Sequence, residues 1–261
     1  MQRYIVIEKR VGYTPLQELE ELKRAAPELA QVPLTYAGRL DPMASGKLLV
    51  LIGDECKKKK QYEKLDKEYE FEVLLGFKTD TGDVLGLSDD SCPTPTVVGK
   101  SLIGKHTFPY PAFSSKTVGG KPLFEYALAG TLDTIEIPTI DVRIYGMEYL
   151  GSRVVAKGEL QKDIVDKINT LQAEGNTGRV AADFRKDEIA DRWRQVLESG
   201  PNQYEILRFK ATVSSGTYIR TLSSLIAQKL GAEGLAYSIH RTRIGRYQPI
   251  MGRLGFWRRT F

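Results

Sequence analysis

Residues 67–77 carry a strict two-residue alternation, and this feature limits the possible folds more than any other part of the sequence. Its apolar positions are Tyr69, Phe71, Val73, Leu75 and Phe77, and glutamates occupy positions 68, 70 and 72. A strand places successive side chains on opposite faces of a sheet, so the pattern predicts a strand with one buried and one solvated face. Such strands are typical of antiparallel sheets.

The other expected elements alternate irregularly along the chain. Strands are predicted over residues 4–8, 142–150 and 205–213. A helix is predicted to begin at Pro15 behind a capping box formed by Thr14 and Gln17, and further helices over residues 53–64, 121–130 and 217–230. Residues 36–52 resemble a structured loop that enters a strand. The predicted class is α+β, with a mixed, mostly antiparallel sheet and flanking helices.

Residues 157–200 differ in character, because they are charged and have helical periodicity. One apolar stripe contains Ile164, Ile168 and Leu171, and a second contains Ile189, Trp193 and Leu197. We interpret this segment as a helical insertion between two strands of the sheet.

The composition excludes several classes of protein. An excess of 38 Lys+Arg over 33 Asp+Glu gives a net charge of +5, which permits nucleic-acid binding without proving it. Two cysteines and two histidines supply neither a disulfide framework nor a well-stocked zinc site. The aliphatic run at 48–52 is too short to span a bilayer, and the first residues lack a signal peptide. We therefore expect a cytoplasmic protein without membrane association.

Motifs for a catalytic serine and for familiar cofactors are missing as well. The sequence has no G-x-S-x-G and no G-x-G-x-x-G. Gly99-Lys100-Ser101 ends like a P-loop, but Thr94 stands where its first glycine is required. We expect no metal and no cofactor.

One acidic residue lies in a setting suited to chemistry. Asp41 lies in a glycine-flanked loop with the sequence GRLDPMASG over residues 38–46. Pro42 has no backbone N–H and restrains Asp41 to extended geometry, which would hold the carboxylate in one place. A fixed carboxylate can act as a nucleophile or a general base. The ordinary alternative is an aspartate that caps a turn.

Four blocks, in order, resemble the TruB family of pseudouridine synthases. They lie at residues 36–46 with Gly53, at 67–86, at 110–127 and at 214–222. The resemblance covers most of the chain outside 157–200. Two positions depart from the family pattern: Tyr36 replaces the histidine usual in bacterial members, and Arg10 replaces a proline of the opening motif.

This resemblance implies a pseudouridine synthase fold and a single catalytic domain over residues 1–261, with the C-terminal PUA-type RNA-binding domain absent or vestigial. The implied reaction converts uridine to pseudouridine at uridine 55 in the T-arm of tRNA. Uracil stays in the pocket as its own leaving group, so no cofactor is needed, and the protein is expected to be a monomer. Two alternatives stay open: the same chemistry on another RNA such as rRNA, and a non-catalytic tRNA-binding chaperone.

The resemblance also assigns two catalytic residues. Asp41 matches the family nucleophile, which attacks C6 of the base or C1′ of the ribose. Arg220 matches the arginine that pairs with it, although an arginine at this position would ordinarily be a solvated residue on a helix surface.

Four further positions match residues that bind the substrate. Tyr69 corresponds to the tyrosine that stacks on the flipped base, although the strand pattern alone would make it a core aromatic residue. Tyr218 lies at a position near the flipped nucleotide, Ile239 at an apolar position near the uracil, and Tyr36 at a contact to the target loop.

Residues 240–259 combine arginines with aromatic side chains. Arginine contacts phosphates and stacks on bases, so residues 240–259 are a candidate RNA-binding edge. The lysines at 57–60 are a second candidate, against the ordinary reading of a solvated face. The arginines concerned are Arg241, Arg243, Arg246, Arg253, Arg258 and Arg259, and the aromatic residues are Tyr247, Phe256 and Trp257.

Overall fold

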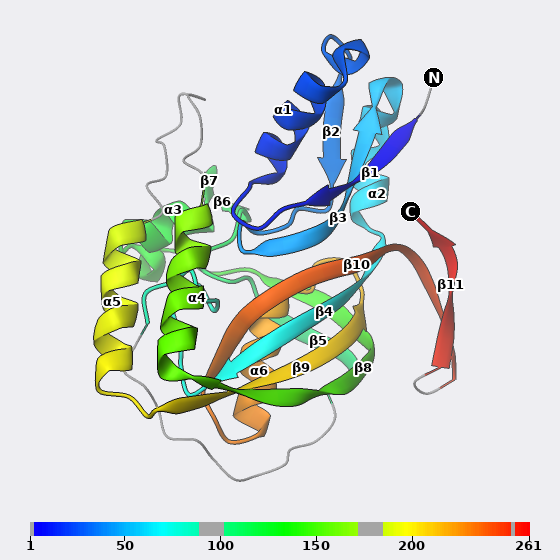
Figure 1. Cartoon of the computed structure of the whole chain (residues 1–261). Helices are drawn as coiled ribbons and strands as arrows, with labels where there is room; N and C mark the ends of the chain where they lie inside the picture. Colours follow the sequence, from blue (N-terminus) through cyan, green and yellow to red (C-terminus); the bar gives the residue numbers. More distant parts are fainter. Residues whose placement is uncertain (1–2, 89–101, 172–184, 252–253) are drawn as a thin grey trace.

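A mixed sheet of nine strands organises the residues that the computed structural model describes, which are 3–88, 102–171, 185–251 and 254–261 (Figure 1). The strands β3 and β10 pair in parallel, and the other neighbours in this sheet pair antiparallel. The expected α+β class with a mostly antiparallel sheet is confirmed. In order across the sheet the strands are β1 (Tyr4–Lys9), β3 (Ala44–Ile52), β10 (Gly234–Met251), β4 (Asp66–Leu75), β9 (Gln203–Val213), β8 (Thr139–Ala156) and β5 (Gly104–Pro109), while β2 (Leu34–Ala37) pairs with β3 and β11 (Leu254–Thr260) with β10.

Helices flank this sheet in three places. In Figure 1, α6 lies behind the central strands, α4 and α5 stand together beside them, and α1 lies next to the β1–β3 part. A separate two-stranded hairpin of β6 (Thr117–Val118) and β7 (Lys121–Pro122) precedes α3. The helices are α1 (Pro15–Ala25), α2 (Lys59–Glu63), α3 (Leu123–Leu128), α4 (Lys157–Thr170), α5 (Lys186–Glu198) and α6 (Ile219–Lys229), with 3-10 turns at Pro27–Leu29, Gly53–Lys58 and Leu132–Thr134.

The start of α1 follows the predicted capping box. The Thr14 hydroxyl accepts the Gln17 amide at 3.3 Å, and the Gln17 side chain accepts the Thr14 amide at 2.7 Å. These two bonds satisfy backbone donors that the first turn of a helix leaves unpaired. The capping prediction is therefore confirmed.

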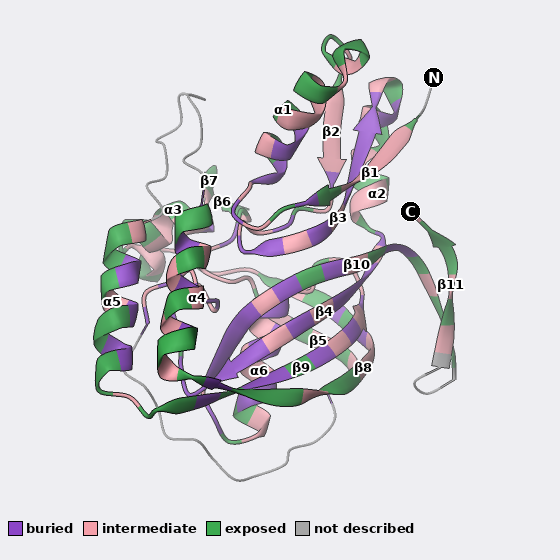
Figure 2. Cartoon of the chain, in the orientation of Figure 1, coloured by how far each residue is buried: buried purple, intermediate pink, exposed green. Residues whose placement is uncertain are grey.

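Strand β4 confirms the alternating pattern but not its full extent. Tyr69, Phe71 and Val73 are buried, as expected, and the alternation of burial along the strands is visible in Figure 2. The strand ends at Leu75, and Phe77 lies beyond it. The expectation of a solvated face is wrong at Glu68, which is buried because three neighbouring side chains cover and pair with it: Thr242, Lys210 and Arg243.

The segment 157–200 forms the two expected helices, although residues 172–184 lie outside the described residues. All six residues of the predicted apolar stripes are buried, and all of them except Leu171, which follows the end of α4, join the same core cluster as β4 and β9. Trp193 of α5 lies 5.1 Å from the ring of Phe77, between ring centroids. The helices are thus packed into the main core.

The segment 36–52 contains more regular structure than the sequence predicts. Tyr36 belongs to strand β2, and the loop is confined to residues between Ala37 and Ala44. A long apolar helix of the kind that crosses a membrane does not occur among the described residues.

Candidate active site

Asp41 lies in the short loop between β2 and β3, residues 38–43. Gly38 begins the loop with a φ of 78°, in the left-handed region that glycine occupies readily. The Asp41 carbonyl accepts the Ala44 amide at 3.0 Å, and the Pro42 carbonyl accepts the Gly12 amide at 2.9 Å. The backbone on both sides of the carboxylate is therefore fixed, in agreement with the expectation from the sequence.

Two fully buried cationic side chains, Arg241 and Lys9, hold this loop through its backbone carbonyls. The Arg241 guanidinium donates to the carbonyls of Gly38 at 3.0 Å and Lys47 at 2.7 Å. The Lys9 ammonium donates to the carbonyls of Pro42 at 3.2 Å and Ala44 at 2.5 Å. Each carbonyl gains a charge-assisted bond, and each cation replaces its lost hydration.

Burial changes the titration of the lysines in this region. Desolvation lowers the pKa of Lys9 to about 7, although the negative charges of Glu18 and Asp41 oppose the shift. Lys67, on β4, donates to the carbonyls of Glu63 and Leu65. Its pKa is also lowered to about 7, first by burial and then by the neighbouring charge of Arg241.

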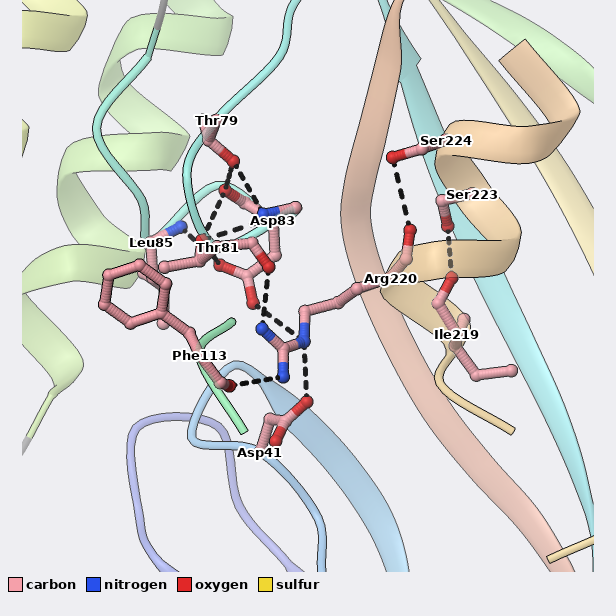
Figure 3. Close-up of polar contacts among 11 residues, drawn as sticks. Asp41, Thr79, Thr81, Asp83, Leu85, Phe113, Ile219, Arg220, Ser223 and Ser224 are labelled. Atoms are coloured by element: carbon pink, nitrogen blue, oxygen red, sulfur yellow. Dashed lines mark hydrogen bonds and ion pairs between the residues drawn. The ribbon is translucent and has the colours of Figure 1, made fainter. Parts of the chain in front are cut away.

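Arg220 lies opposite Asp41, as the sequence predicts. It belongs to the first turn of α6 and is 4% exposed, so it is not a solvated surface residue. Its Nε lies 2.8 Å from Asp41 Oδ2, and 32% of the Asp41 side chain is exposed (Figure 3). The Nε–H is not aligned with an acceptor, so the contact is an ion pair more than a directed hydrogen bond. One carboxylate oxygen is thus held while the group stays accessible.

Three groups outside the predicted site complete the surroundings of Arg220. Its Nη1 donates to the Thr81 carbonyl at 2.6 Å and its Nη2 to the Phe113 carbonyl at 3.0 Å. Asp83 Oδ2 lies 3.7 Å from Arg220 Nε (Figure 3). These residues lie within the blocks that resemble the TruB family, but the sequence alone suggests no role for them.

Asp83 is a second, fully enclosed carboxylate. Its Oδ1 accepts the Thr81 hydroxyl and the Leu85 amide, both at 2.9 Å. Burial raises the pKa of Asp83, and the positive charge of Arg220 opposes that shift. Burial also disfavours the charge of Arg220, but the attraction of Asp41 and Asp83 outweighs it and raises the pKa of Arg220. The guanidinium therefore carries its charge between two acids.

Tyr69 and Ile239 lie on the sheet face beneath the Asp41 loop. Ile239 of β10 pairs with Ala44 of β3 in the parallel pairing, and Ala44 is three positions after Asp41 in the sequence. Tyr69 of β4 stands opposite Arg241, whose side chain reaches the loop. Both residues are buried in one cluster with Leu40 and Met43 of the loop. Strand pairing thus places Ile239 directly beside the end of the loop and Tyr69 opposite the arginine that anchors it, and Tyr69 is a core residue at the same time.

Tyr218 is also near Asp41, whereas Tyr36 is not part of this group. Burial raises the pKa of the Tyr218 hydroxyl, and the charge of Asp41 adds to the shift. Tyr36 packs against another cluster, formed by Leu19, Leu48 and Val50, with the Lys59 ammonium 5.0 Å from its ring centroid. The structure therefore places Tyr36 on the α1 side of the β1–β3 region.

The C-terminal arginines separate into buried and exposed residues. The expectation that Arg241 faces RNA is wrong, because its guanidinium is buried under the Asp41 loop. Arg243 pairs with Glu68 at 3.4 Å. Arg253 lies outside the described residues. The exposed members are Arg243, Arg246, Arg258 and Arg259.

The lysine run at 57–60 has local partners. Lys57 pairs with Asp54 at 2.7 Å, Lys58 with Glu55 at 3.2 Å and Lys59 with Glu63 at 3.7 Å. These pairs match the ordinary reading of a charged helical face. Within the described ranges, no three His, Cys, Asp or Glu side chains gather as metal ligands would.

Comparison with known proteins gives both fold and sequence matches. The chain is 27% identical over 249 residues to tRNA pseudouridine synthase B of Aromatoleum aromaticum, and 28% identical over 255 residues to tRNA pseudouridine synthase 4 of Saccharomyces cerevisiae. These alignments cover 93% and 85% of this chain, but the chain spans only 63% of the length of either relative.

A solved structure of a Cbf5-Nop10-Gar1 complex contains a chain with the same fold. It matches with a TM-score of 0.52 and 17% identity, over 93% of this chain and 49% of that chain. The expected pseudouridine synthase fold is thereby confirmed.

The family model for the N-terminal domain of TruB family pseudouridylate synthases matches residues 29–161. This range contains the Asp41 loop, β4 and the segment around Asp83, whereas Arg220, Tyr218 and Ile239 lie outside it. It covers half of the chain, and the chain therefore belongs to the TruB family of pseudouridylate synthases.

Proposed function

We propose that this protein converts uridine to pseudouridine in RNA, with Asp41 as the nucleophile. The observation that carries the proposal is the accessible Asp41 carboxylate, held 2.8 Å from the buried Arg220 on a loop that is anchored by Lys9 and Arg241. A fixed and charged acid suits nucleophilic attack without an added cofactor. The names of the two relatives, both tRNA pseudouridine synthases, support the same reaction.

The chemistry requires one acid and a way to hold a reactive base. Asp41 attacks either C6 of uracil or C1′ of the ribose. By either route the N1–C1′ bond breaks and a C5–C1′ bond forms. The bond from Asp41 to the substrate is then released, C5 loses its proton and N1 takes one up, so that the product is an isomer of the substrate. Arg220 pairs with the attacking carboxylate and orients it. The uracil remains in the pocket throughout, which favours an enclosed site.

The buried aromatic residues fit a nucleotide that has left its stack. Flipping a uridine out of a folded RNA costs on the order of a few kcal/mol, and stacking on a protein side chain recovers part of this. In our proposal Tyr69 stacks on the base, Ile239 packs against it, and Tyr218 lies beside the ribose. Tyr69 is 7% exposed, so the side chains that cover it have to move when the base enters. Tyr36 contacts the target RNA only outside this pocket.

We propose tRNA as the substrate and uridine 55 of its T-arm as the target. The exposed Arg246, Arg258 and Arg259 contact the RNA backbone in this proposal. A monomeric state, action in the cytoplasm, and a single catalytic domain that works without a PUA-type domain are further parts of the proposal. The alternatives are a target in rRNA and a tRNA chaperone without catalytic activity.

The test uses the wild-type chain and Asp41→Asn with a uridine-labelled tRNA transcript, without added metal or cofactor. Nucleoside analysis is expected to find pseudouridine with the wild-type protein and none above background with the variant. Binding of the transcript is expected to stay the same, because the amide is isosteric with the acid. The control is Asp54→Asn, which changes an exposed acid far from the loop.

Each alternative has its own outcome. Turnover by Asp41→Asn would remove the assigned nucleophile. Tight tRNA binding without any product from the wild-type protein would favour the chaperone. Product in an rRNA transcript, and none in tRNA, would change the substrate but keep the chemistry.

A further inference from the structure

The loop at residues 79–88 lies between the Arg220 guanidinium and helix α5. Its two ends meet in a bridge between Thr79 and Ser88. The loop supplies two of the groups that surround Arg220, the Thr81 carbonyl and the Asp83 carboxylate. The position of Arg220 therefore depends on the position of this loop.

The loop is held on two sides by different parts of the chain. Strand β10 holds one side through its backbone: the Ala236 amide donates to the Gly82 carbonyl at 3.0 Å, and the Val84 amide donates to the Ala236 carbonyl at 3.3 Å. The other side is held by side chains of α5 and of the residue before it. Because both sides of the loop carry contacts, removing one set leaves the loop attached but less restricted.

Three side chains make the contacts from the α5 side. The buried Trp193 indole donates to the Val84 carbonyl at 3.0 Å. Arg192 donates to the Ser88 carbonyl at 2.7 Å. Arg185 donates to Asp80 Oδ2 at 2.8 Å. These contacts meet the loop at its start, its middle and its end.

Arg185, the residue directly before α5, has two features that set it apart from the side chains of this helix. Its guanidinium also lies 5.1 Å from the ring centroid of Phe113, and the Phe113 carbonyl is the acceptor of Arg220 Nη2. One side chain thus touches both segments that hold Arg220. Its φ of 52° is the only positive value at a non-glycine among the described residues. A strained backbone of this kind persists where the surrounding contacts enforce it.

The charges of α4 and α5 argue against a role in RNA binding. Helix α4 has three lysines and three acids, and α5 has three cations and four acids. A surface that binds phosphates has a clear positive excess. The buried stripes of both helices are packed into the core that contains Tyr69 and Ile239. The segment therefore interacts with the core of the protein and not with RNA.

We infer that α5 positions the Arg220–Asp41 pair through Arg185 and Trp193, by fixing the 79–88 loop that holds Arg220. Arg185 and Trp193 are positioning residues, because they reach Asp41 only through this loop and Arg220. The inference rests on the proposed function, since it assigns the segment 157–200 a part in the same reaction. It predicts that damage to these contacts slows the chemical step and leaves RNA affinity unchanged.

The test measures single-turnover pseudouridine formation at saturating enzyme, together with the Kd for the tRNA transcript. Arg185→Ala and Trp193→Phe are expected to slow the single-turnover rate by about tenfold or more, because a small displacement of a catalytic group has large kinetic effects. The Kd is expected to stay within about twofold, since neither side chain contacts RNA in this scheme. Arg185→Lys keeps the charge beside Asp80 and is expected to recover part of the rate.

The matched control is Arg194→Ala, which removes an exposed arginine of the same helix that pairs with Asp191. It is expected to leave both the rate and the Kd unchanged. An unchanged rate in Arg185→Ala and Trp193→Phe would overturn the inference. So would a weaker Kd with an unchanged rate at saturation, because that result makes α5 a contact to RNA.

A readout without turnover separates this inference from the proposed function. The NMR signal of the Arg220 Nε–H, assigned by its loss in Arg220→Lys, is expected to move in Arg185→Ala and to stay in Arg194→Ala. If the signal stays in both, the positioning role is wrong whether or not the protein makes pseudouridine. A wild-type protein that makes none contradicts the proposed function alone.

Discussion

The two loops that meet at the Arg220–Asp41 pair are held by different kinds of contact. The 38–43 loop is anchored by Arg241 and Lys9, two buried cations that belong to the sheet. The 79–88 loop is anchored on its outer side by an indole and by a partly exposed ion pair between Arg185 and Asp80. The first arrangement links the site to the stability of the whole fold. In the second arrangement the ion pair between Arg185 and Asp80 is partly exposed, so its loss is expected to cost little stability.

The largest expected effect is the loss of the buried anchor of the first loop. Arg241→Met removes the side-chain donor of the partly buried carbonyls of Gly38 and Lys47. An unsatisfied buried acceptor costs roughly 1–3 kcal/mol, so we expect the free energy of unfolding to fall by about 3 kcal/mol or more. Urea denaturation measures this change. The control is Arg246→Met in the same strand, which changes an exposed arginine. Equal losses in the two variants would refute the anchoring role of Arg241.

The next effect is a dependence of stability on pH. In the folded protein the pKa values of Lys9 and Lys67 are lowered to about 7, whereas an unfolded lysine titrates near its ordinary value of 10.5. Between these values the unfolded chain binds more protons, so stability rises with pH. We expect a rise of about 1 kcal/mol per pH unit for each lysine as pH increases from 7 to 9.

Urea denaturation at several pH values checks this expectation. Lys9→Met is expected to lower stability at every pH, because it leaves the Pro42 and Ala44 carbonyls without their donor. It is also expected to make the pH profile less steep, since one of the two lysines no longer titrates. A wild-type stability that is flat or falls over this pH range would show that both lysines remain charged in the folded state.

The smallest expected effect belongs to the second loop. Arg185→Ala removes an ion pair in which the two side chains are 24% and 31% exposed, and partly exposed pairs contribute little. We expect the free energy of unfolding to change by less than about 1 kcal/mol. Thermal or urea unfolding measures it beside Arg241→Met. A loss as large as that of Arg241→Met would remove the contrast between the loops.

Local patterns predicted those parts of the molecule that depend on neighbours in sequence. The capping box of Thr14, the alternation of β4 and the restrained Asp41 loop each depend on a few adjacent residues. Burial of Glu68 and Arg241 was not predicted, because it depends on which strands lie beside β4 and β3. Glu68 of β4 appears solvated until β9 and β10 are placed beside it. Arg241, which belongs to β10, appears solvated until that strand is placed beside β3.

The candidate site divides in the same way. Asp41 and Arg220 were paired in advance only through the family resemblance, because 179 positions separate them and no spacing rule links them. Thr81, Asp83 and Phe113 were missed as partners of Arg220, since two of the contacts use backbone carbonyls. Every residue has a backbone carbonyl, so the residue type does not show which carbonyl accepts a hydrogen bond. The roles of Tyr36, Tyr69, Tyr218 and Ile239 stay predictions.

The parallel pairing of β3 with β10 has a consequence for how the protein is made. It joins Ala44 to Ile239 and Gly46 to Arg241, partners that are 195 residues apart. During synthesis on the ribosome, the 38–43 loop emerges early. Its anchor Arg241 is synthesised only after most of the chain has been made. Contacts of such long sequence separation form slowly. The Asp41 loop thus acquires its final geometry among the last events of folding. If Asp41 is the nucleophile that we propose, a nascent chain that stalls before β10 is expected to be inert.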